Sequence, residues 1–432
     1  MTWSIRNFLA AHNLLAVSAN RQEPAMNAEQ ELDTTLLVDA GSMLTYQALK
    51  FLNREEMTGK EEPDRVHDLG GKVAGTLSFS RAQPQHLAFL LAYGLGEVQT
   101  TAAGASGYRH AIRPRSGEVD VSRSNPSFTA AMRFGRQVLK RRFASCFIDQ
   151  VRLEFAKDGW AKITGTVKGS GKVGDNTQVE PVTAAYNAES LTLAANGVAG
   201  DTAAQRLSNV QGIQALDPAT QAWEDVSYRG VSGEAPAVIT ITPPGAGSDP
   251  TTYRVYYLPG ESGWMAFPAR VEEPPLKVSQ VEVILGGRWD GAAFQGGHRL
   301  AAEVRRITWS LKNNLSPESC PGAGGPYANR AFRTGREQKL GIDRDFRDFL
   351  MAQHLQDNDY LAFYLKAEGP EFESGVRYQV ELVFPRVAVV AAPVKAAQRR
   401  LAEDVELAVL EDDDFGSVIC YVQNQVSGYA AG

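Results

Sequence analysis

The chain has 432 residues, enough for two or three domains of roughly 150 residues each. Its 43% hydrophobic and 22% charged residues are typical of a globular protein and exclude a disordered or fibrous chain. Because 44 Lys and Arg face 50 Asp and Glu, the net charge of −6 argues against a broad surface for nucleic-acid phosphates. Three widely spaced cysteines, Cys146, Cys320 and Cys420, predict neither a disulfide framework nor a zinc site, and favour a reducing compartment.

The N-terminal stretch 3–17 is apolar, but His12 and Asn13 interrupt it before it reaches the length of a signal-peptide core. Its apolar residues recur at helical spacing, which predicts a short amphipathic helix followed by an arm that ends near residue 32. A membrane-surface anchor is the alternative, disfavoured because Arg6 is the only cation of the stretch. No uninterrupted apolar run of roughly 18 residues occurs, so no membrane insertion is predicted.

Most of the body alternates between apolar and polar residues, which is typical of half-buried strands. Strands are predicted at 73–80, 151–155, 161–168, 278–285, 304–311, 338–342, 360–365, 376–384 and 418–422. Two short helices are predicted, one at 84–93 with Gly94 as its C-terminal cap and one at 345–356 with acidic residues in its first turn. The fold class is therefore mainly β.

The succession of elements repeats along the chain. Strand 73–80 leads into helix 84–93, and strand 338–342 leads into helix 345–356. This pattern predicts a duplicated β-plus-helix unit, with coincidence as the alternative. Between the halves, the Ala-, Gly-, Thr- and Pro-rich segment 187–268 contains expected strands at 237–242 and 252–258, which predict an inserted immunoglobulin-like β module. The expected domains are 1–32, 33–186, 187–268 and 269–432.

No motif predicts catalysis. Residues 169–174 match the dinucleotide pattern G-x-G-x-x-G, but polar residues and Pro181 follow where a helix is required. The sequence contains neither G-x-S-x-G nor H-E-x-x-H, and its six histidines are scattered. We therefore expect no enzyme, no cofactor and no catalytic, cofactor-binding or metal-binding residues; a hydrolase with dispersed carboxylates is the alternative.

Three charged segments are candidates for contacts between subunits, with solvated loops as the alternative. The long loop 53–71 suits a docking arm that orders on a neighbour, or a mobile loop. The charged residues proposed for its contacts are Arg54, Glu55, Glu56, Lys60, Glu61, Glu62, Asp64 and Arg65. The two possible intersubunit patches are basic (Arg133, Arg136, Lys140, Arg141, Arg142) and acidic (Glu411, Asp412, Asp413, Asp414).

Several local stretches, taken in their order along the chain, resemble the tail tube (major tail) proteins of tailed bacteriophages. They are 144–155 followed by 160–169, then 306–315, then 384–387, 392–394, 418–424 and Tyr429. The resemblance spans most of 33–180 and 276–429, and the middle insertion departs from it. It implies tandem tail-tube-type β-sandwich or barrel domains, each with a short helix.

The resemblance further implies a self-assembling structural subunit of the virion tail, assembled in the bacterial host cytoplasm. Sheets would join edge to edge into rings that stack around an acidic channel for DNA ejection, with loop 53–71 as the ring-stacking arm. Three copies would complete a pseudo-sixfold ring if both halves are tube domains, and six copies if only one half lines the channel. The implied partners are further copies, the tape measure, terminator and tip proteins, and DNA in transient, non-specific passage.

A second hypothesis is a carbohydrate-binding adhesin or a virion decoration protein. It rests on the aromatic residues of the insertion, which core packing would also explain. These residues are Trp223, Tyr228, Tyr253, Tyr256, Tyr257 and Trp264.

Overall fold

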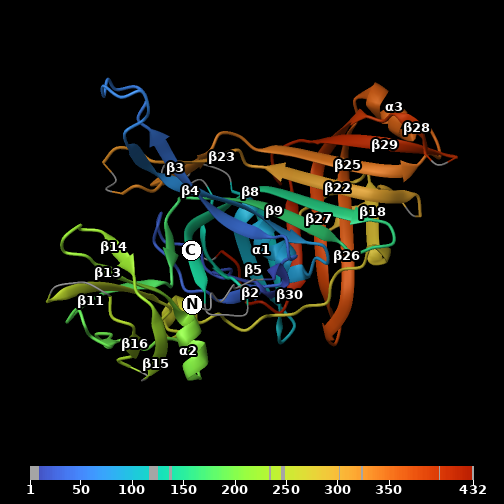
Figure 1. The fold of residues 1–432 in the computed structure, drawn as a ribbon. Coiled ribbons are helices and arrows are strands. Elements are labelled where there is room, and N and C mark those ends of the chain that lie inside the picture. Colours follow the sequence, from blue (N-terminus) through green and yellow to red (C-terminus); the bar gives the residue numbers. More distant parts are fainter. Residues whose placement is uncertain are drawn as a thin grey trace. The chain divides into compact units, whose positions relative to one another are not determined.

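The computed structural model describes residues 9–115, 125–135, 139–232, 235–244, 249–300, 302–322, 325–397 and 399–430 (Figure 1). The chain divides into two compact units. One comprises 1–14, 131–142 and 173–267, and the other, the body, comprises 15–130, 143–172 and 268–432. Strands dominate both units, so the predicted mainly β class is confirmed. The helical elements are α1 (Pro84–Leu95), α2 (Ala203–Asn209), α3 (Leu350–Asp357) and the 3-10 turns η1 (Ala10–His12), η2 (Gly263–Met265) and η3 (Val278–Gln280).

One long antiparallel sheet runs through the body, and we call it the long sheet. In spatial order it consists of β3 (Met43–Leu52), β4 (Val66–Phe79), β9 (Lys162–Gly169), β8 (Lys140–Ala156), β22 (Val304–Lys312), β25 (Glu337–Asp345), β29 (Arg400–Val409) and β27 (Val376–Ala391). The short strand β28 (Val394–Ala397) continues the line of β27 along β29. Side chains alternate between the two faces, with one face buried and the other polar.

A second sheet, the cover sheet, shares β27 with the long sheet. Its strands are β5 (Gly96–Ala103), β6 (Gly107–Pro114), β30 (Ile419–Asn424), β27, β26 (Tyr360–Glu373), β18 (Val281–Leu285) and β21 (His298–Arg299). Trp309 of the long sheet contacts Phe384 of β27, with ring centroids 5.6 Å apart, so the core lies between the layers. Each strand predicted from alternation lies largely within an observed strand, except that 278–280 form η3 ahead of β18.

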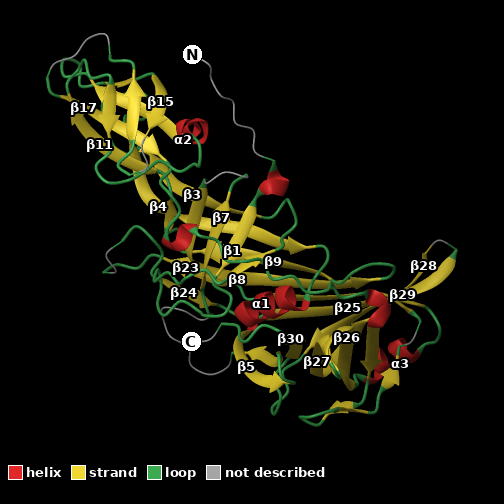
Figure 2. Ribbon diagram, turned by 90° about the horizontal axis from the view of Figure 1, so that it is seen from below, coloured by secondary structure: helices red, strands yellow, loops and turns green. Residues whose placement is uncertain are grey.

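Helix α1 is enclosed by the two sheets, contacting β9 of the long sheet and β6 and β30 of the cover sheet (Figure 2). All of its residues are buried, as expected for a helix that is apolar around its circumference. It extends two residues beyond the prediction, to Leu95, and Gly96, with a φ of 101°, is its C-terminal cap. Gly94 is therefore not the cap. A Cβ atom at Gly94 would lie 3.0 Å from the Val151 side chain, so this glycine permits close packing of the helix on β8.

Two predicted helices are corrected. The helix predicted at 345–356 begins only at Leu350, the first residue of α3. Its predicted first residue, Asp345, still belongs to the strand β25, where the neighbouring Arg344 is buried and lies 2.6 Å from Glu403. The predicted N-terminal helix is wrong over Leu14–Val17, which form the strand β1; its residues 3–8 lie outside the described part. β1 pairs with β2 (Thr34–Leu36) and β7 (Phe128–Arg133).

The arm that follows β1 is fixed to the body by a buried carboxylate. Glu23 accepts hydrogen bonds from the hydroxyls of Ser127 (2.8 Å), Thr129 (2.6 Å) and Ser145, and from the Ser145 amide (2.9 Å). Because a buried charge is tolerated only when it is paired or hydrogen-bonded, these donors hold the arm in place.

The other unit contains a seven-stranded β sandwich, which we call the module. One sheet has the order β11 (Gln178–Ala184), β17 (Thr251–Tyr257), β13 (Val210–Leu216), β14 (Trp223–Asp225), and the other has β12 (Ser190–Thr192), β16 (Val238–Ile241), β15 (Tyr228–Ser232). Apolar residues of both sheets form a core of their own. The first strand, β11, precedes residue 187 and pairs with β17, so Gln178 lies opposite Tyr257.

The remaining strands are short. β10 (Val173–Asp175) pairs with β8, β19 (Arg288–Trp289) pairs with β20 (Phe294–Gln295), and β23 (Leu315–Glu318) pairs with β24 (Arg330–Arg333).

Candidate functional site

The long sheet consists of two successive groups of four strands with the same connectivity. In the first group the spatial order is β3, β4, β9, β8; in the second it is β22, β25, β29 and the continuous edge formed by β27 and β28. In each group a helix follows the second strand, and the last two strands form a hairpin that pairs back onto that second strand. The repetition expected from the sequence is therefore matched by the strand order.

A seam of backbone pairing joins the two groups. β8 of the first group runs antiparallel to β22 of the second, from Gln150 opposite Lys312 to Ala156 opposite Arg306. On the buried face of this seam Leu153 lies opposite Trp309, and both side chains are almost fully buried.

The long sheet ends in two unpaired edges. Within the described part of the chain, β3 pairs only with β4, and from Val389 onward the β27–β28 edge pairs only with β29. Val390 (50% exposed) and Val394 (42%) stand along the second edge. Since β3 corresponds to β22 and β27–β28 corresponds to β8, the two free edges are equivalent to the two edges that meet at the seam. Such an edge is a template for pairing with another chain.

The polar face of the long sheet is hollowed. A cavity of about 370 Å³ lies over β8, β22, β25 and β29. The basic residues that line it are Arg152, Arg306 and Lys339, and the acidic ones are Asp343, Asp404 and Glu406. Thr308 and Ser310 provide short side chains between them. This face therefore carries alternating charges on a concave surface.

The predicted arm is the tip of the β3–β4 hairpin, and it is shorter than expected because β4 already begins at Val66. Asn53 closes the loop 53–65, since its amide donates to the Arg65 carbonyl (3.0 Å) and its side chain donates to Glu56 (2.9 Å) and Asp64 (3.2 Å). Lys60 lies 3.8 Å from Asp64. The other charged residues of the predicted arm are exposed: Arg54, Glu55, Glu61, Glu62 and Arg65.

The arm also carries exposed apolar side chains, which are not among the residues predicted to make its contacts. Met57 at the tip is fully exposed, and Phe51, Leu52, Val66 and Leu69 are exposed along the hairpin. The signal for them was present in the sequence, because apolar residues interrupt an otherwise highly charged stretch.

The described residues of the predicted basic patch make contacts within their own unit. Lys140 is buried and forms an ion pair with Glu261, while Arg141 lies 2.5 Å from Asp175. Arg142 lies over the ring of Trp264, 4.9 Å from its centroid, and Arg133 donates to the Gly135 carbonyl (3.2 Å). Arg136 lies outside the described residues. A role of this patch between subunits stays a prediction.

The predicted acidic patch forms a turn ahead of β30. Asp412 accepts hydrogen bonds from the amides of Asp414 (3.0 Å) and Phe415 (3.1 Å), while Glu411, Asp413 and Asp414 are exposed. Its role between subunits also stays a prediction.

Part of the aromatic set of the module belongs to its core. Tyr253 and Tyr257 are buried between the two sheets, and Tyr228 packs against them. Trp223 is stacked by Arg254, whose guanidinium lies 3.8 Å from the ring centroid, and the Tyr256 hydroxyl donates to Gln214 (3.2 Å). Trp264 contacts Arg142, as described above.

Among the described residues, no group of three or more His, Cys, Asp or Glu side chains is arranged to hold a metal ion. No described helix is long and apolar enough to cross a membrane.

Comparison with known proteins adds little. No protein-family model matches the chain, and no curated protein matches it. Among solved structures, a variant of the Hcp1 protein from E. coli (EAEC 042 pathovar) aligns with 33% of this chain and 96% of its own, at 14% identity and a TM-score of 0.18. A TM-score this low carries no argument about fold or function.

Proposed function

We propose that the chain is the structural subunit of a bacteriophage-type tail tube. Copies would join through their free sheet edges into rings, and the rings would stack around a channel for DNA passage. The observation that carries this proposal is the seam between β8 and β22, because the two free edges of the long sheet are the counterparts of the two strands that pair there. The edge of one copy therefore offers its neighbour the same type of junction that the chain already makes internally.

The repeated strand order favours three copies per ring. Each chain supplies two equivalent four-stranded groups, so three chains give six groups and a pseudo-sixfold ring. The contact between copies is heterologous, since β3 of one meets β27–β28 of the next, and a heterologous contact with the right rotation closes into a ring. Six copies per ring would leave the second group without a role in the wall.

The concave polar face is the surface that we assign to the channel. Its basic residues Arg152, Arg306 and Lys339 stand among Asp343, Asp404 and Glu406, so no continuous basic strip is available to hold phosphates. The resemblance implied an acidic channel, whereas this face has mixed charges. The chain would act without catalytic residues or cofactor in the virion tail, with tape measure, terminator and tip proteins as partners.

The ring contact can be tested by cross-linking its two edges. In a Cys320→Ser background, Thr45→Cys on β3 and Val394→Cys on β28 place two accessible thiols on the free edges, while Cys146 and Cys420 are buried. A short bismaleimide should convert assembled protein into covalent species that end at the trimer on a denaturing gel. Each single-cysteine variant is the control and should remain monomeric.

Negative-stain microscopy across a concentration series supplies the count of subunits per ring. Three chains per ring would support the proposal, and six would overturn the stoichiometry. Protein that forms neither rings nor edge cross-links at any concentration would overturn the proposed function, and retention of such monomers on glycan resins would favour the adhesin.

A further inference from the structure

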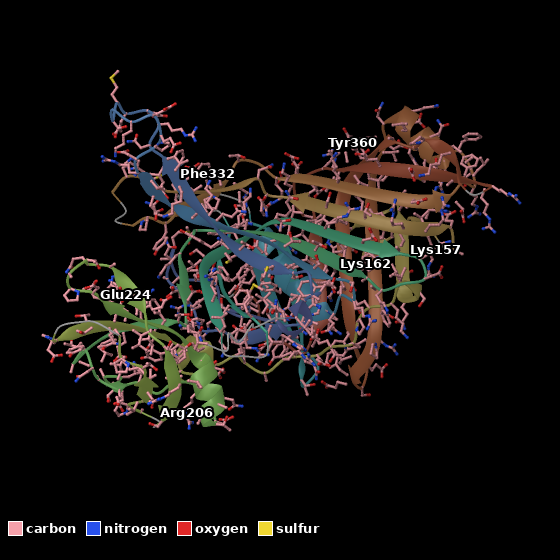
Figure 3. The ribbon with its side chains drawn as sticks, viewed as in Figure 1. Lys157, Lys162, Arg206, Glu224, Phe332 and Tyr360 are labelled. Atoms are coloured by element: carbon pink, nitrogen blue, oxygen red, sulfur yellow. The ribbon has the colours of Figure 1, made fainter. Side chains whose placement is uncertain are left out.

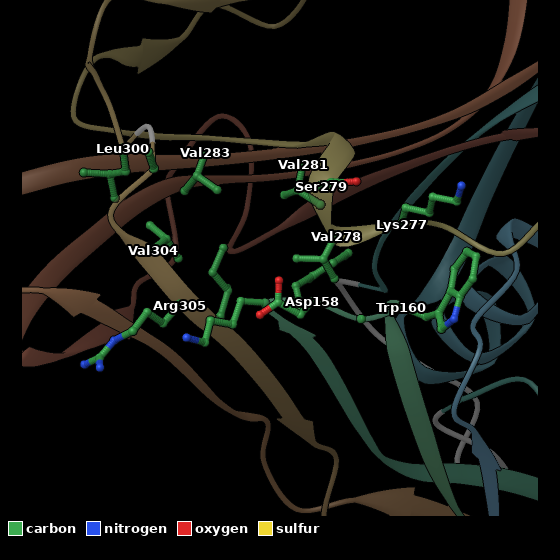
Figure 4. Close-up of a pocket in the computed structure, with 15 residues that line it drawn as sticks. Asp158, Trp160, Lys277, Val278, Ser279, Val281, Val283, Leu300, Val304 and Arg305 are labelled. Carbon is green, nitrogen blue, oxygen red and sulfur yellow. The ribbon is translucent and has the colours of Figure 1, made fainter. Parts of the chain in front are cut away.

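A second hollow lies at one end of the body, between the two sheets. Its volume is about 540 Å³, and it opens beside the turn that joins β8 to β9 (Figure 4). Apolar side chains from both layers form its wall: Phe155, Val278, Val281, Val283, Leu300 and Val304. The proposed ring contact does not involve these residues. We call this hollow the end cavity.

The rim of the end cavity is predominantly basic. Lys157 and Lys277 are exposed there, and the Lys277 ammonium group lies over the ring of Trp160, 5.6 Å from its centroid. Arg305 is already neutralised, because it lies 2.8 Å from Asp343 and 3.5 Å from Asp345. Asp158 is the acidic residue of the rim. An apolar knob surrounded by acidic groups would therefore complement this cavity.

The tip of the β3–β4 arm has these properties. Met57 is fully exposed, and the exposed charged residues near it in the sequence are the acids Glu55, Glu56, Glu61 and Glu62 and the bases Arg54, Lys60 and Arg65. Methionine is unbranched and polarisable, so it fills apolar cavities of irregular shape. The tip thus presents one flexible apolar side chain among charged residues of which the acidic ones outnumber the basic ones.

The arm and the end cavity lie at opposite ends of the long sheet. Phe79 of β4 pairs with Ile163 of β9 beside the β8–β9 turn, where Lys157 and Lys162 lie (Figure 3). At the other end of the same pair Val73 lies opposite Gly169, and the β3–β4 hairpin continues beyond that point to its tip. A chain therefore cannot place its own Met57 in its own cavity, whereas copies stacked head to tail bring one tip to the next cavity.

We propose that Met57 of one copy inserts into the end cavity of a copy in the adjacent ring, with Glu55, Glu56, Glu61 and Glu62 facing Lys157 and Lys277 of that copy. The occupant is a second copy of this chain. This inference rests on the proposed stacking of rings, and it names the receptor site that the stacking arm would use.

Disulfide trapping tests the contact. In the Cys320→Ser background, Met57→Cys and Ser279→Cys place one thiol at the tip and one at the cavity rim. Oxidation of assembled protein should give a ladder of covalent multimers that passes well beyond the trimer, because each link joins two rings. The Thr45→Cys and Val394→Cys pair gives no covalent species larger than the trimer. The two gel patterns therefore distinguish contacts between rings from contacts within a ring. Each single cysteine should give no ladder.

Substitution tests the same contact without cross-linking. Met57→Asp and the cavity-filling Ser279→Trp should each leave rings intact and raise the concentration needed for tubes at least tenfold. Met57→Leu should retain stacking, and Val179→Asp, at an exposed valine of the module, is the control for added charge.

The outcomes separate this inference from the proposed function. An unmodified protein that forms no rings would overturn both. A different result would overturn the arm-to-cavity contact alone. In that case rings stack into tubes, the Met57→Cys and Ser279→Cys pair gives no ladder, and Met57→Asp forms tubes at the same concentration as the parent.

Discussion

At the scale of single residues, Glu273 is a buried carboxyl group whose pKa is raised by its surroundings. Its side chain contacts the first turn of α1, where the Gln85 amide donates to one of its oxygens at 2.7 Å. Burial raises its pKa from 4.5 to about 7, although hydrogen bonds from Gln85, Gln425 and Asn424 act in the opposite direction. Desolvation therefore outweighs hydrogen bonding at this site.

The sign of the pH dependence follows from this shift. The native state keeps the proton of Glu273 up to about pH 7, while the unfolded chain releases it near pH 4.5, so the free energy of unfolding falls between these values. At about 1.4 kcal/mol per pKa unit, the loss amounts to about 3 kcal/mol. Glu273→Gln mimics the protonated acid and should be more stable than the parent at pH 8, with little difference at pH 4.5. Urea unfolding at both values measures this, and a difference independent of pH would contradict it.

At the scale of elements, the packing of α1 depends on a glycine in the neighbouring strand. A Cβ atom at Gly165 would lie 2.6 Å from the Leu90 side chain of α1. Because every residue of α1 is buried, the helix cannot move away without clashing with other residues. Gly165→Ala should therefore reduce the free energy of unfolding by about 1–3 kcal/mol. Gly212→Ala is a suitable control, because no atom lies within 4 Å of the added Cβ. Equal effects of both substitutions in urea unfolding would contradict the packing argument.

The arm gives a second prediction at this scale. Because the Asn53 amide bonds to the Arg65 carbonyl, residues 54–64 can be replaced by an Asn-Gly turn that keeps the hairpin closed. The shortened protein should unfold like the parent and form rings, but not tubes, as judged by negative-stain microscopy. Tubes of normal length would show that the arm has no part in stacking.

Alternation predicted six of the eight strands of the long sheet, but not β3 and β29, and the sequence also predicted most of α1. Leu14–Val17 was mistaken for helix because four consecutive apolar residues that are buried as a strand carry no period of two. The free edges and the seam could not be predicted at all. Pairing between β8 and β22 joins residues about 150 positions apart. The sequence of one strand does not specify which other strand it pairs with. The basic run illustrates the same limit, since its contacts with Glu261 and Trp264 depend on how its unit folds.

At the scale of the whole molecule, the module should be separable from the body. It has its own apolar core, and Gln178 and Tyr257 are paired, so the chain enters and leaves it at neighbouring points. Replacing residues 178–257 by a short Gly-Ser linker should leave the thermal unfolding of the body and the formation of rings unchanged. Calorimetry and microscopy test this. Loss of the body's unfolding transition would show that the two units depend on each other.

The β8–β22 seam has a consequence for how the proposed assembly would depend on protein concentration. Two sheet groups in one polypeptide meet at an effective concentration that does not depend on how much protein the cell contains. In a ring of three such chains, half of the junctions exist before any encounter between molecules. At equilibrium the concentration of such rings scales with the third power of the free-subunit concentration, whereas rings of six separate single-group subunits would scale with the sixth power. The proposed rings would therefore form at lower protein concentrations than rings of six separate subunits.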